Sequence, residues 1–579
     1  IRSGARRRRR APGRRSTSSG ARHHAPARRR RRQRPRWPLL IALLVVVGAA
    51  VAVQVSPSGV SARTIAARYA RDWTRGDYPG MYGLLDPHSQ RAISLHRFEA
   101  AYRSALATAT ATSLQAGRVG DAGTRSVPVH FTVRTRLFGR LHETLQVPIL
   151  NGSRGPRVEF SGVLLFPGLR AGEQLSRRSS LGQRGTLLAD DGTPLAQGPG
   201  RTSPLPGVAG EIVGTLGPIP AGEASHYRAL GYPADARVGQ DGLELIFQNQ
   251  LAGRPGARLL AGRRVLAEVP VQDGQTVRTT IDPKVEEAAI NALGGRYAGI
   301  TVMDPRTGAL LGLAGIAYSD VQPPGSTMKI VTSTAALQAG LVTLNTQFPV
   351  LTSTTIDGFR MQNAAGEACG GTLLNAFAVS CDTVFAPLGA RIGGARLVST
   401  AERFGFDQPT GIPGALESTI PSPANIGSSL AVAASAIGQG KVQASTLEMA
   451  DVAATIADAG RRPIPTFLAG ARPRFVNVTT SRIASEVQQM MVAVVRYGTG
   501  TSAQIPGVEV AGKTGTAELA NTAGKANATK YTDGWFVGYA PVGDPKVVAA
   551  ALFPAAGYGA STAAPAVSQA LQAALKAGK

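Results

Sequence analysis

The stretch Gln322-Pro-Pro-Gly-Ser-Thr-Met-Lys-Ile-Val331 places a serine three residues ahead of a lysine. Pro-Pro-Gly is a turn signal and the apolar run behind it ends at Gly340, so the segment predicts a buried helix that begins at Ser326. Residues three apart share a helix face, which brings the Lys329 amine close to the Ser326 hydroxyl. Burial favours the neutral amine, which can then accept the hydroxyl proton. The simpler interpretation is a helix-capping serine followed by a lysine whose amine reaches solvent.

Histidine is absent from the sequence around this pair and after it. The seven histidines are His23, His24, His88, His96, His130, His142 and His226. A Ser-His-Asp hydrolase and a histidine-ligated metal site are therefore excluded for the domain that holds Ser326. If Ser326 is a nucleophile, Lys329 is the candidate base at hand.

A second lysine lies between glycines in Gly512-Lys-Thr-Gly-Thr516, after the β-like run Gly507-Val-Glu-Val-Ala511. The glycines let a substrate backbone come close, and a strand here can offer its free edge to an extended peptide. Lys513 and the hydroxyls of Thr514 and Thr516 can hold a carboxylate. The Thr516 backbone N–H can face a developing oxyanion.

A third segment, Val379-Ser-Cys-Asp-Thr383, is expected on a helix or loop between the two lysine motifs. Ser380 can relay a proton between the two lysines or to a leaving amine. The order S-x-x-K, S-x-[N/D], K-T-G is that of penicillin-binding proteins and class A β-lactamases. The chain resembles the transpeptidase domain of penicillin-binding proteins, and Ile437-Gly-Gln-Gly440 and Gly534-Trp-Phe-Val-Gly-Tyr-Ala-Pro541 fit the same resemblance.

The resemblance implies a D,D-transpeptidase that needs no metal or organic cofactor. Ser326 would attack the penultimate D-Ala carbonyl of a peptidoglycan stem peptide on a lipid-linked precursor, with Lys329 as the base. The amides of Ser326 and Thr516 would form the oxyanion hole, and β-lactams would acylate the same serine. The expected catalytic set is Ser326, Lys329, Ser380, Asp382 and Lys513, and the expected substrate-binding set is Thr514, Gly515 and Thr516.

Asp382 departs from the family pattern, which usually has asparagine at this position. An ionised carboxylate only accepts hydrogen bonds, and it favours the charged forms of Lys329 and Lys513. Either Asp382 is held protonated or it pairs with a lysine. Some actinobacterial members look similar here, so we expect a specialised S-x-D type that penicillins acylate more slowly while transpeptidation is retained. The alternative is a merely tolerated substitution.

The remainder resembles the monofunctional class B branch of the family. Arg184-Gly185, Asp191-Gly192 and Val238-Gly-Gln-Asp-Gly-Leu-Glu244 are similar to its non-catalytic pedestal, or dimerisation domain. Trp73 and Gly76-Asp77-Tyr78 are similar to the insert found in methicillin-resistance-type members, a domain that is itself similar to nuclear transport factor 2 (NTF2). The expected fold is multidomain α+β. The expected parts are a disordered basic tail at 1–36, a transmembrane anchor at 37–55, an NTF2-like α+β domain at 62–166, an extended pedestal at 170–275 and a serine β-lactamase/transpeptidase-like α/β domain at 276–579.

Local patterns predict several elements of these domains. Helical patterns cover 65–73 and 98–106, and β-like runs cover 127–133, 145–149 and 158–166. In the last domain, a helix is expected at 283–293. It is followed by a hairpin with strands at 299–304 and 309–314.

The formal net charge of +27 belongs mainly to the N-terminal tail. Residues 1–36 hold 16 arginines and no acid, so 27 − 16 leaves +11 for the remaining 543 residues. The uncharged segment 37–55 is long enough to cross a bilayer, and arginines on its one flank orient the N-terminus to the cytoplasm. We therefore expect a single-pass protein of the cell membrane with an extracytoplasmic catalytic domain. A cleaved signal peptide is the alternative, and nucleic-acid binding by the tail applies only if the anchor is wrong.

Several alternatives remain open at this point. Cys369 and Cys381 either pair in an oxidising compartment or are two buried thiols. A non-catalytic penicillin-binding scaffold for a cell-wall synthase is an alternative function, although the intact Ser326, Lys329 and Lys513 argue against it. A β-lactam sensor would need more membrane spans, and a β-lactamase would not need the pedestal. By resemblance, a polytopic glycan polymerase is the expected partner.

Overall fold

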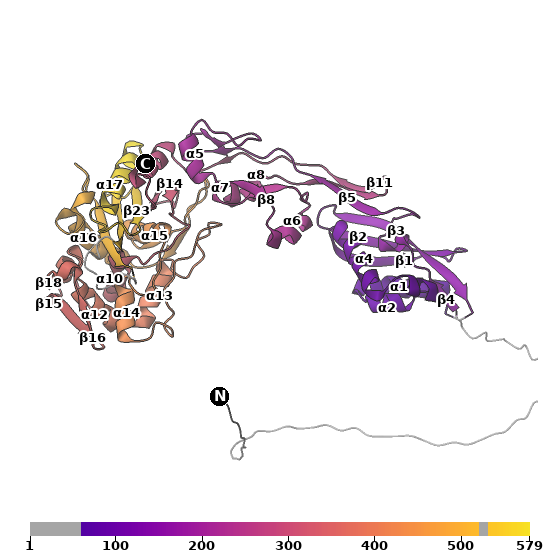
Figure 1. Ribbon diagram of the computed structural model, residues 1–579, viewed down its shortest axis with the longest axis horizontal. Helices are drawn as coiled ribbons and strands as arrows, with labels where there is room; N and C mark the ends of the chain where they lie inside the picture. The colour runs from indigo at the N-terminus through magenta and orange to yellow at the C-terminus, as the bar shows by residue number, and fades with distance from the viewer. Residues whose placement is uncertain (1–59, 154, 520–530) are drawn as a thin grey trace, which may run out of the picture. The chain divides into compact units, whose positions relative to one another are not determined.

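The computed structural model describes residues 60–153, 155–519 and 531–579 (Figure 1). The predicted basic tail at 1–36 and the predicted anchor at 37–55 lie outside these residues. No helix in the described ranges is long and apolar enough to cross a membrane. The anchor and the tail therefore stay predictions.

The N-terminal domain packs helices against a four-stranded antiparallel sheet of order β1-β2-β3-β4. Its elements are α1 (Ala62–Arg75), α2 (Tyr78–Gly83), α3 (Pro87–Ala92), α4 (Leu95–Thr108), β1 (Ala111–Val119), β2 (Ser126–Thr135), β3 (Arg140–Gly152), β4 (Gly155–Val158) and the 3₁₀ turn η1 (Gly162–Leu165). Ser61 caps α1 by accepting the Thr64 N–H, and Gly76 ends the helix in the left-handed region. Trp73 meets Tyr102 edge to face in the core between helices and sheet.

Four of the five elements predicted for this domain are confirmed, and the strand predicted at 158–166 is wrong. Val158 ends β4, and the chain then turns through η1, which buries Leu164 without the alternation of a strand. Strand β1 was not predicted at all. Its side chains are mostly exposed, so its sequence lacks the alternation of apolar and polar residues that marks a half-buried strand.

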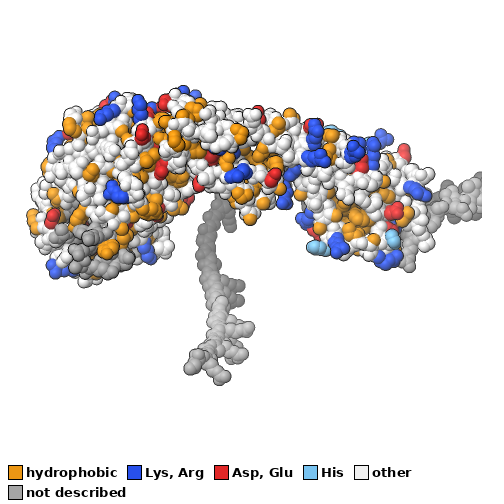
Figure 2. All heavy atoms as spheres, turned by 45° about the horizontal axis from the view of Figure 1, so that its top comes forward, with side chains coloured by type: hydrophobic (Ala, Val, Ile, Leu, Met, Phe, Trp, Pro, Cys, Tyr) orange, Lys and Arg blue, Asp and Glu red, His pale blue; other side chains and the backbone are white. Residues whose placement is uncertain are grey.

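The middle domain is built from short elements. They are β5 (Leu175–Ser180), β6 (Leu187–Leu188), β7 (Pro194–Ala196), α5 (Pro206–Ile212), β8 (Leu216–Pro218), η2 (Ala221–Glu223), α6 (Ala224–Leu230), β9 (Arg237–Gly239), α7 (Gly242–Ile246), α8 (Gln248–Leu251), β10 (Gly256–Ala261), β11 (Arg264–Val269) and β12 (Val277–Arg278). Among them, Glu244 is buried and pairs with two arginines, since Arg184 lies 2.6 Å and Arg201 2.5 Å from its two carboxylate oxygens. In the face drawn in Figure 2, Lys and Arg side chains gather over the β5–β10–β11 sheet and the N-terminal domain.

The C-terminal domain is organised by a five-stranded antiparallel sheet of order β14-β13-β23-β22-β21. The sheet strands are β13 (Gly299–Met303), β14 (Leu310–Gly315), β21 (Ala511–Glu518), β22 (Thr532–Ala540) and β23 (Val547–Phe553). In β23, Val548 and Ala550 belong to one apolar core and Ala549 and Ala551 to the other. Helices α9 (Pro283–Leu293) and α17 (Ala563–Lys576) cover one face, and α15 (Thr446–Ala457) lies on the other with α10 (Lys329–Gln338) in the same core (Figure 1).

The remaining elements lie around this sheet. They are η3 (Gly325–Met328), β15 (Gln347–Leu351), β16 (Ser353–Ile356), β17 (Phe359–Gln362), η4 (Ala364–Gly366), β18 (Cys369–Thr372), α11 (Leu373–Ala378), α12 (Asp382–Ile392), α13 (Gly394–Phe404), α14 (Ser429–Ala436), β19 (Arg461–Pro463), β20 (Phe475–Asn477), α16 (Ser481–Arg496) and η5 (Thr501–Ala503). The helix predicted at 283–293 and the β13–β14 hairpin are confirmed. Both have strong local signals, since Asp282 caps the helix and Gly294 ends it in the left-handed region.

Helix α9 buries an acid against the hairpin. The Glu286 side chain is fully buried and accepts a hydrogen bond of 2.5 Å from the Leu313 N–H. Burial raises the pKa of Glu286 to about 8, and the Leu313 hydrogen bond opposes this only in part. The folded protein therefore keeps this carboxyl protonated at neutral pH, whereas the unfolded chain ionises it near its ordinary value of 4.5.

Replacing Glu286 with glutamine is expected to remove one source of alkaline instability. The raised pKa contributes to the free energy of unfolding. This stabilising contribution is fully present below about pH 4.5 and is lost as the pH rises through about 8. Thermal melts should therefore find Glu286→Gln more stable than wild type near ~pH 9 and close to it near ~pH 5. Glu287→Gln, at the exposed next position, is the control. If the melting temperatures of wild type and Glu286→Gln changed in the same way with pH, the raised pKa of Glu286 would be contradicted.

Candidate active site

The predicted nucleophile lies in a tight turn in front of the predicted helix. Ser326 is in η3 and is half-buried, and Lys329 opens α10 with its side chain buried. Gly325 has φ 52°, and a Cβ on it would lie 2.8 Å from the Thr516 carbonyl oxygen. Only glycine satisfies both conditions, so the backbone ahead of Ser326 packs directly on the K-T-G strand.

The K-T-G motif is itself the edge strand of the sheet. Strand β21 begins at Ala511 and pairs with β22 from that residue to Glu518. The prediction that a β-like run at 507–511 precedes the motif is therefore wrong in position, because the strand starts where that run ends. The outer edge of β21 has no neighbouring strand among the described residues, as expected for an edge that accepts an extended peptide.

The substrate-binding candidates are placed differently along β21. Gly515 lies close under the Ser326 turn, since a Cβ on it would be 2.8 Å from the Pro324 carbonyl oxygen. The Thr514 hydroxyl is buried and shares a hydrogen bond of 2.5 Å with the Thr499 hydroxyl. Thr516 is partly exposed. Of the two threonine side chains, Thr516 is thus the more accessible to a ligand.

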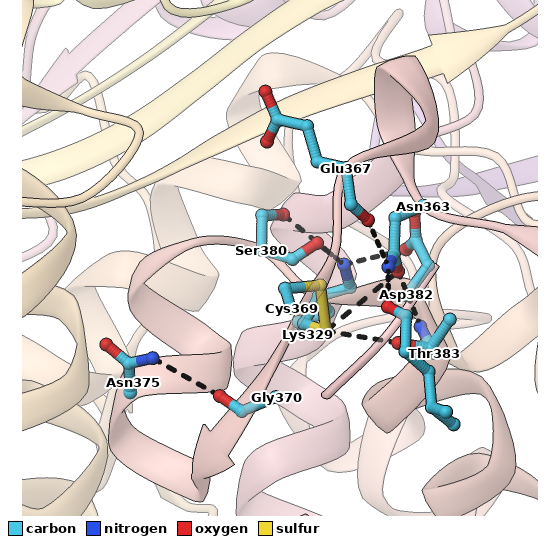
Figure 3. The surroundings of a disulfide bond; sticks show 11 residues. Lys329, Asn363, Glu367, Cys369, Gly370, Asn375, Ser380, Asp382 and Thr383 are labelled. Atoms are coloured by element: carbon cyan, nitrogen blue, oxygen red, sulfur yellow. Dashed lines mark hydrogen bonds and ion pairs between the residues drawn. A yellow bond between two sulfur atoms is a disulfide. The ribbon is translucent and has the colours of Figure 1, made fainter. Parts of the chain in front are cut away.

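Ser380 joins the two lysines. It lies between α11 and α12 with φ 61°, a left-handed conformation that is uncommon for a residue with a side chain. The Lys513 amine donates to its hydroxyl at 2.8 Å, and the Lys329 amine donates to its carbonyl at 2.7 Å and its hydroxyl at 3.3 Å. The three sequence motifs therefore converge at one hydroxyl, and Figure 3 shows the Lys329 and Ser380 part of this arrangement.

Asp382 pairs with Lys329. Its carboxylate lies 2.7 Å from the Lys329 amine and opens α12, where the helix dipole favours negative charge (Figure 3). The sequence left open whether Asp382 is protonated or pairs with a lysine, and the structure shows that it pairs with Lys329. The Lys329 amine directs its hydrogen bonds to Ser380 and Asp382, and none to Ser326 is present among the described residues.

Burial controls the protonation of both lysines. Each side chain is 0% exposed, and burial lowers the pKa of Lys329 while Asp382 raises it. The pKa of Lys513 lies well below its usual value, first because of burial and then because of the charge on Lys329, with Asp382 opposing. Two ammonium groups are thus disfavoured in this site, as a mechanism with a lysine base requires.

Sequence reasoning did not find every residue around the site. Phe385 lies 5.5 Å from the Lys329 amine and Phe377 5.5 Å from the Lys513 amine, measured to the ring centroids. Cys369 and Cys381 form a disulfide, which decides between the two alternatives for the cysteines. The phenylalanines flank the S-x-D motif in α11 and α12, but nothing in their spacing marks them as neighbours of an amine.

Comparisons with known proteins agree with this geometry. Three family models match: the NTF2-like N-terminal transpeptidase domain at residues 61–173, the penicillin-binding protein dimerisation domain at 191–279 and the penicillin-binding protein transpeptidase domain at 298–572. Peptidoglycan D,D-transpeptidase PbpA of Mycolicibacterium smegmatis is 30% identical over 356 residues, which is 51% of this chain and 70% of that protein. Peptidoglycan D,D-transpeptidase MrdA of Acinetobacter baumannii is 27% identical over 61% of this chain and 62% of that protein.

Solved structures are similar over the same region. The D,D-transpeptidase domain of a peptidoglycan glycosyltransferase from Eggerthella lenta aligns with a TM-score of 0.55 at 28% identity, over 68% of this chain and 99% of that one. The imipenem acyl-enzyme complex of penicillin-binding protein A from M. tuberculosis aligns with a TM-score of 0.55 at 25% identity, over 68% of this chain and 98% of that one. The chain belongs to the class B penicillin-binding proteins, the monofunctional branch that carries a transpeptidase domain.

Proposed function

We propose that this protein is a peptidoglycan D,D-transpeptidase that cross-links stem peptides through an acyl-enzyme on Ser326. The observation that carries the proposal is the Ser380 hydroxyl, which the amines of Lys329 and Lys513 both contact beside the Ser326 turn. The named transpeptidase relatives support the same activity.

Acylation begins with transfer of the Ser326 hydroxyl proton to neutral Lys329. The serine oxygen bonds to the penultimate D-Ala carbonyl carbon, and the amides of Ser326 and Thr516 receive the oxyanion. When the oxyanion collapses, the carbon–nitrogen bond breaks and terminal D-Ala leaves with a proton that Ser380 relays. The proton returned to the leaving amine restores neutral Lys329.

Deacylation repeats these steps with another nucleophile. The amine of a neighbouring stem peptide attacks the Ser326 ester, gives up a proton to the Lys329–Ser380 pair and forms the cross-link, and Ser326 regains its proton. The edge of β21 that has no neighbouring strand among the described residues is suited to hold the donor peptide in an extended conformation. β-Lactams enter the first half of this cycle and remain as acyl-enzymes.

The proposal extends to cellular placement. The segment 37–55 would anchor the chain in the cell membrane with the N-terminus in the cytoplasm, so that residues after it reach peptidoglycan outside. The substrate would be the stem peptide of a lipid-linked precursor or of nascent glycan. A polytopic glycan polymerase is the proposed partner, on the strength of the resemblance to the class B branch.

The proposal is tested by supplying the full chain in detergent with a stem peptide that ends in D-Ala-D-Ala, together with an acceptor amine. We expect release of D-Ala, a cross-linked product and, in intact-protein mass spectra with penicillin, one covalent adduct on Ser326. A folded chain that releases no D-Ala and forms no adduct would contradict the proposal and favour a non-catalytic scaffold.

A further inference from the structure

A disulfide reaches into the S-x-D motif. Cys381, the residue between Ser380 and Asp382, is bonded to Cys369 at the start of β18, and their Cα atoms are 5.7 Å apart (Figure 3). Cys381 is fully buried and Cys369 is partly exposed. The middle residue of the motif is therefore fixed to a separate strand by a covalent bond.

A buried amide holds the other side of Asp382. Asn363 donates from its side chain to the carbonyls of Leu351 and Glu367, both at 2.8 Å, and its side-chain oxygen accepts the Thr383 N–H at 2.9 Å. These contacts tie the segment before β18 to the first turn of α12. The disulfide at Cys381 and the hydrogen bond at Thr383 thus lie on either side of Asp382.

The motif needs such support because its backbone is strained. Left-handed φ is unfavourable at a residue with a side chain, and Ser380 adopts it between two helices. In this conformation its carbonyl and hydroxyl both meet the Lys329 amine. Relaxation of Ser380 to an ordinary conformation would turn these groups away from the lysines.

We propose that the Cys369–Cys381 disulfide and Asn363 are positioning elements, which hold the Ser380 hydroxyl against the two lysines so that Ser326 is acylated efficiently. They also hold the Asp382 carboxylate against Lys329, where it sets the pH range of the reaction and not its limiting rate. This inference rests on the proposed function. The disulfide sets the backbone on one side of Asp382, and Asn363 sets it on the other. Among the described residues, neither group forms a hydrogen bond with Ser326 or with the amines of Lys329 and Lys513.

The inference is tested by acylation of the full chain with a fluorescent penicillin between ~pH 5 and ~pH 9. The samples are oxidised wild type, folded wild type treated with dithiothreitol, Cys369→Ala/Cys381→Ala and Asn363→Ala. Dithiothreitol supplies two electrons and two protons, which convert the disulfide to two thiols while the reagent forms its cyclic disulfide. The double variant treated with dithiothreitol controls for other effects of the reagent.

We expect reduction and each set of substitutions to lower the limiting acylation rate by about 10-fold to 100-fold, as small displacements of catalytic groups do. The acidic midpoint of the pH profile should move to lower pH, because Asp382 then supports the charged form of Lys329 less well.

Other results would contradict either the positioning role or the proposed function. An unchanged rate and midpoint in reduced, folded wild type would overturn the inference. A lower rate with an unchanged midpoint would also overturn it, since it would reflect general loosening. If oxidised wild type itself takes no label and releases no D-Ala, the proposed function fails instead.

Discussion

Replacement of Ser326 by alanine is expected to abolish covalent labelling by penicillin and to lower D-Ala release by about 10⁴-fold or more. The reason is that η3 places the Ser326 hydroxyl beside β21, whereas the next hydroxyl residue, Thr327, is buried. Gel fluorescence and release of D-Ala from a stem peptide measure the two effects.

Ser333→Ala is the matched control for this variant. Ser333 lies in α10, is fully buried, and its hydroxyl has no hydrogen-bond partner among the described residues. Its loss should leave labelling within about twofold of wild type, because no hydrogen bond is broken. Labelling of Ser326→Ala at the wild-type level would place the nucleophile elsewhere.

Asp382→Asn is expected to speed acylation by penicillin by about 10-fold to 100-fold at neutral pH. The Asp382 carboxylate raises the pKa of Lys329 against the effect of burial, so its removal increases the fraction of neutral base. Each unit by which the pKa falls gives about tenfold more neutral amine. The acidic limb of the pH–rate profile should accordingly move to lower pH.

The control variant, Asp544→Asn, removes a negative charge that is paired with Lys546 and not with Lys329. Asp544 is an exposed residue 3.9 Å from Lys546, and Asp544→Asn should leave the acylation profile unchanged. Equal rates and midpoints for wild type and Asp382→Asn would show that the carboxylate is only tolerated. The slow acylation expected for the S-x-D type would then need another cause.

Much of the site was predictable because its signals are local. The turn before Ser326 and the helix after it follow from Pro-Pro-Gly and an apolar run, and the three motifs were found by residue type and order. The start of β21 was misplaced because its glycines and threonines lack the apolar alternation of a strand. The strand is defined instead by continuous pairing with β22, which is a tertiary property.

The arrangement around Asp382 was not predictable for a different reason. Pairing with Lys329 depends on the left-handed conformation of Ser380, and nothing in the local sequence favours that conformation. The sequence allowed the cysteines to pair or to remain thiols, since their separation is compatible with both. Asn363 acts through backbone groups on three separate segments, which only the folded chain brings together.

The edge of β21, which has no neighbouring strand among the described residues, has a consequence for stereochemistry. A peptide that pairs with this edge must place successive side chains on opposite sides of the extended sheet. At a fixed backbone position, exchanging the D for the L configuration swaps the Cα hydrogen and the side chain. An L-alanine would therefore direct its methyl group where the D residue has only hydrogen. Pairing with β21 thus makes the two enantiomers present the methyl group in different directions, and this difference is what the enzyme can use to distinguish them.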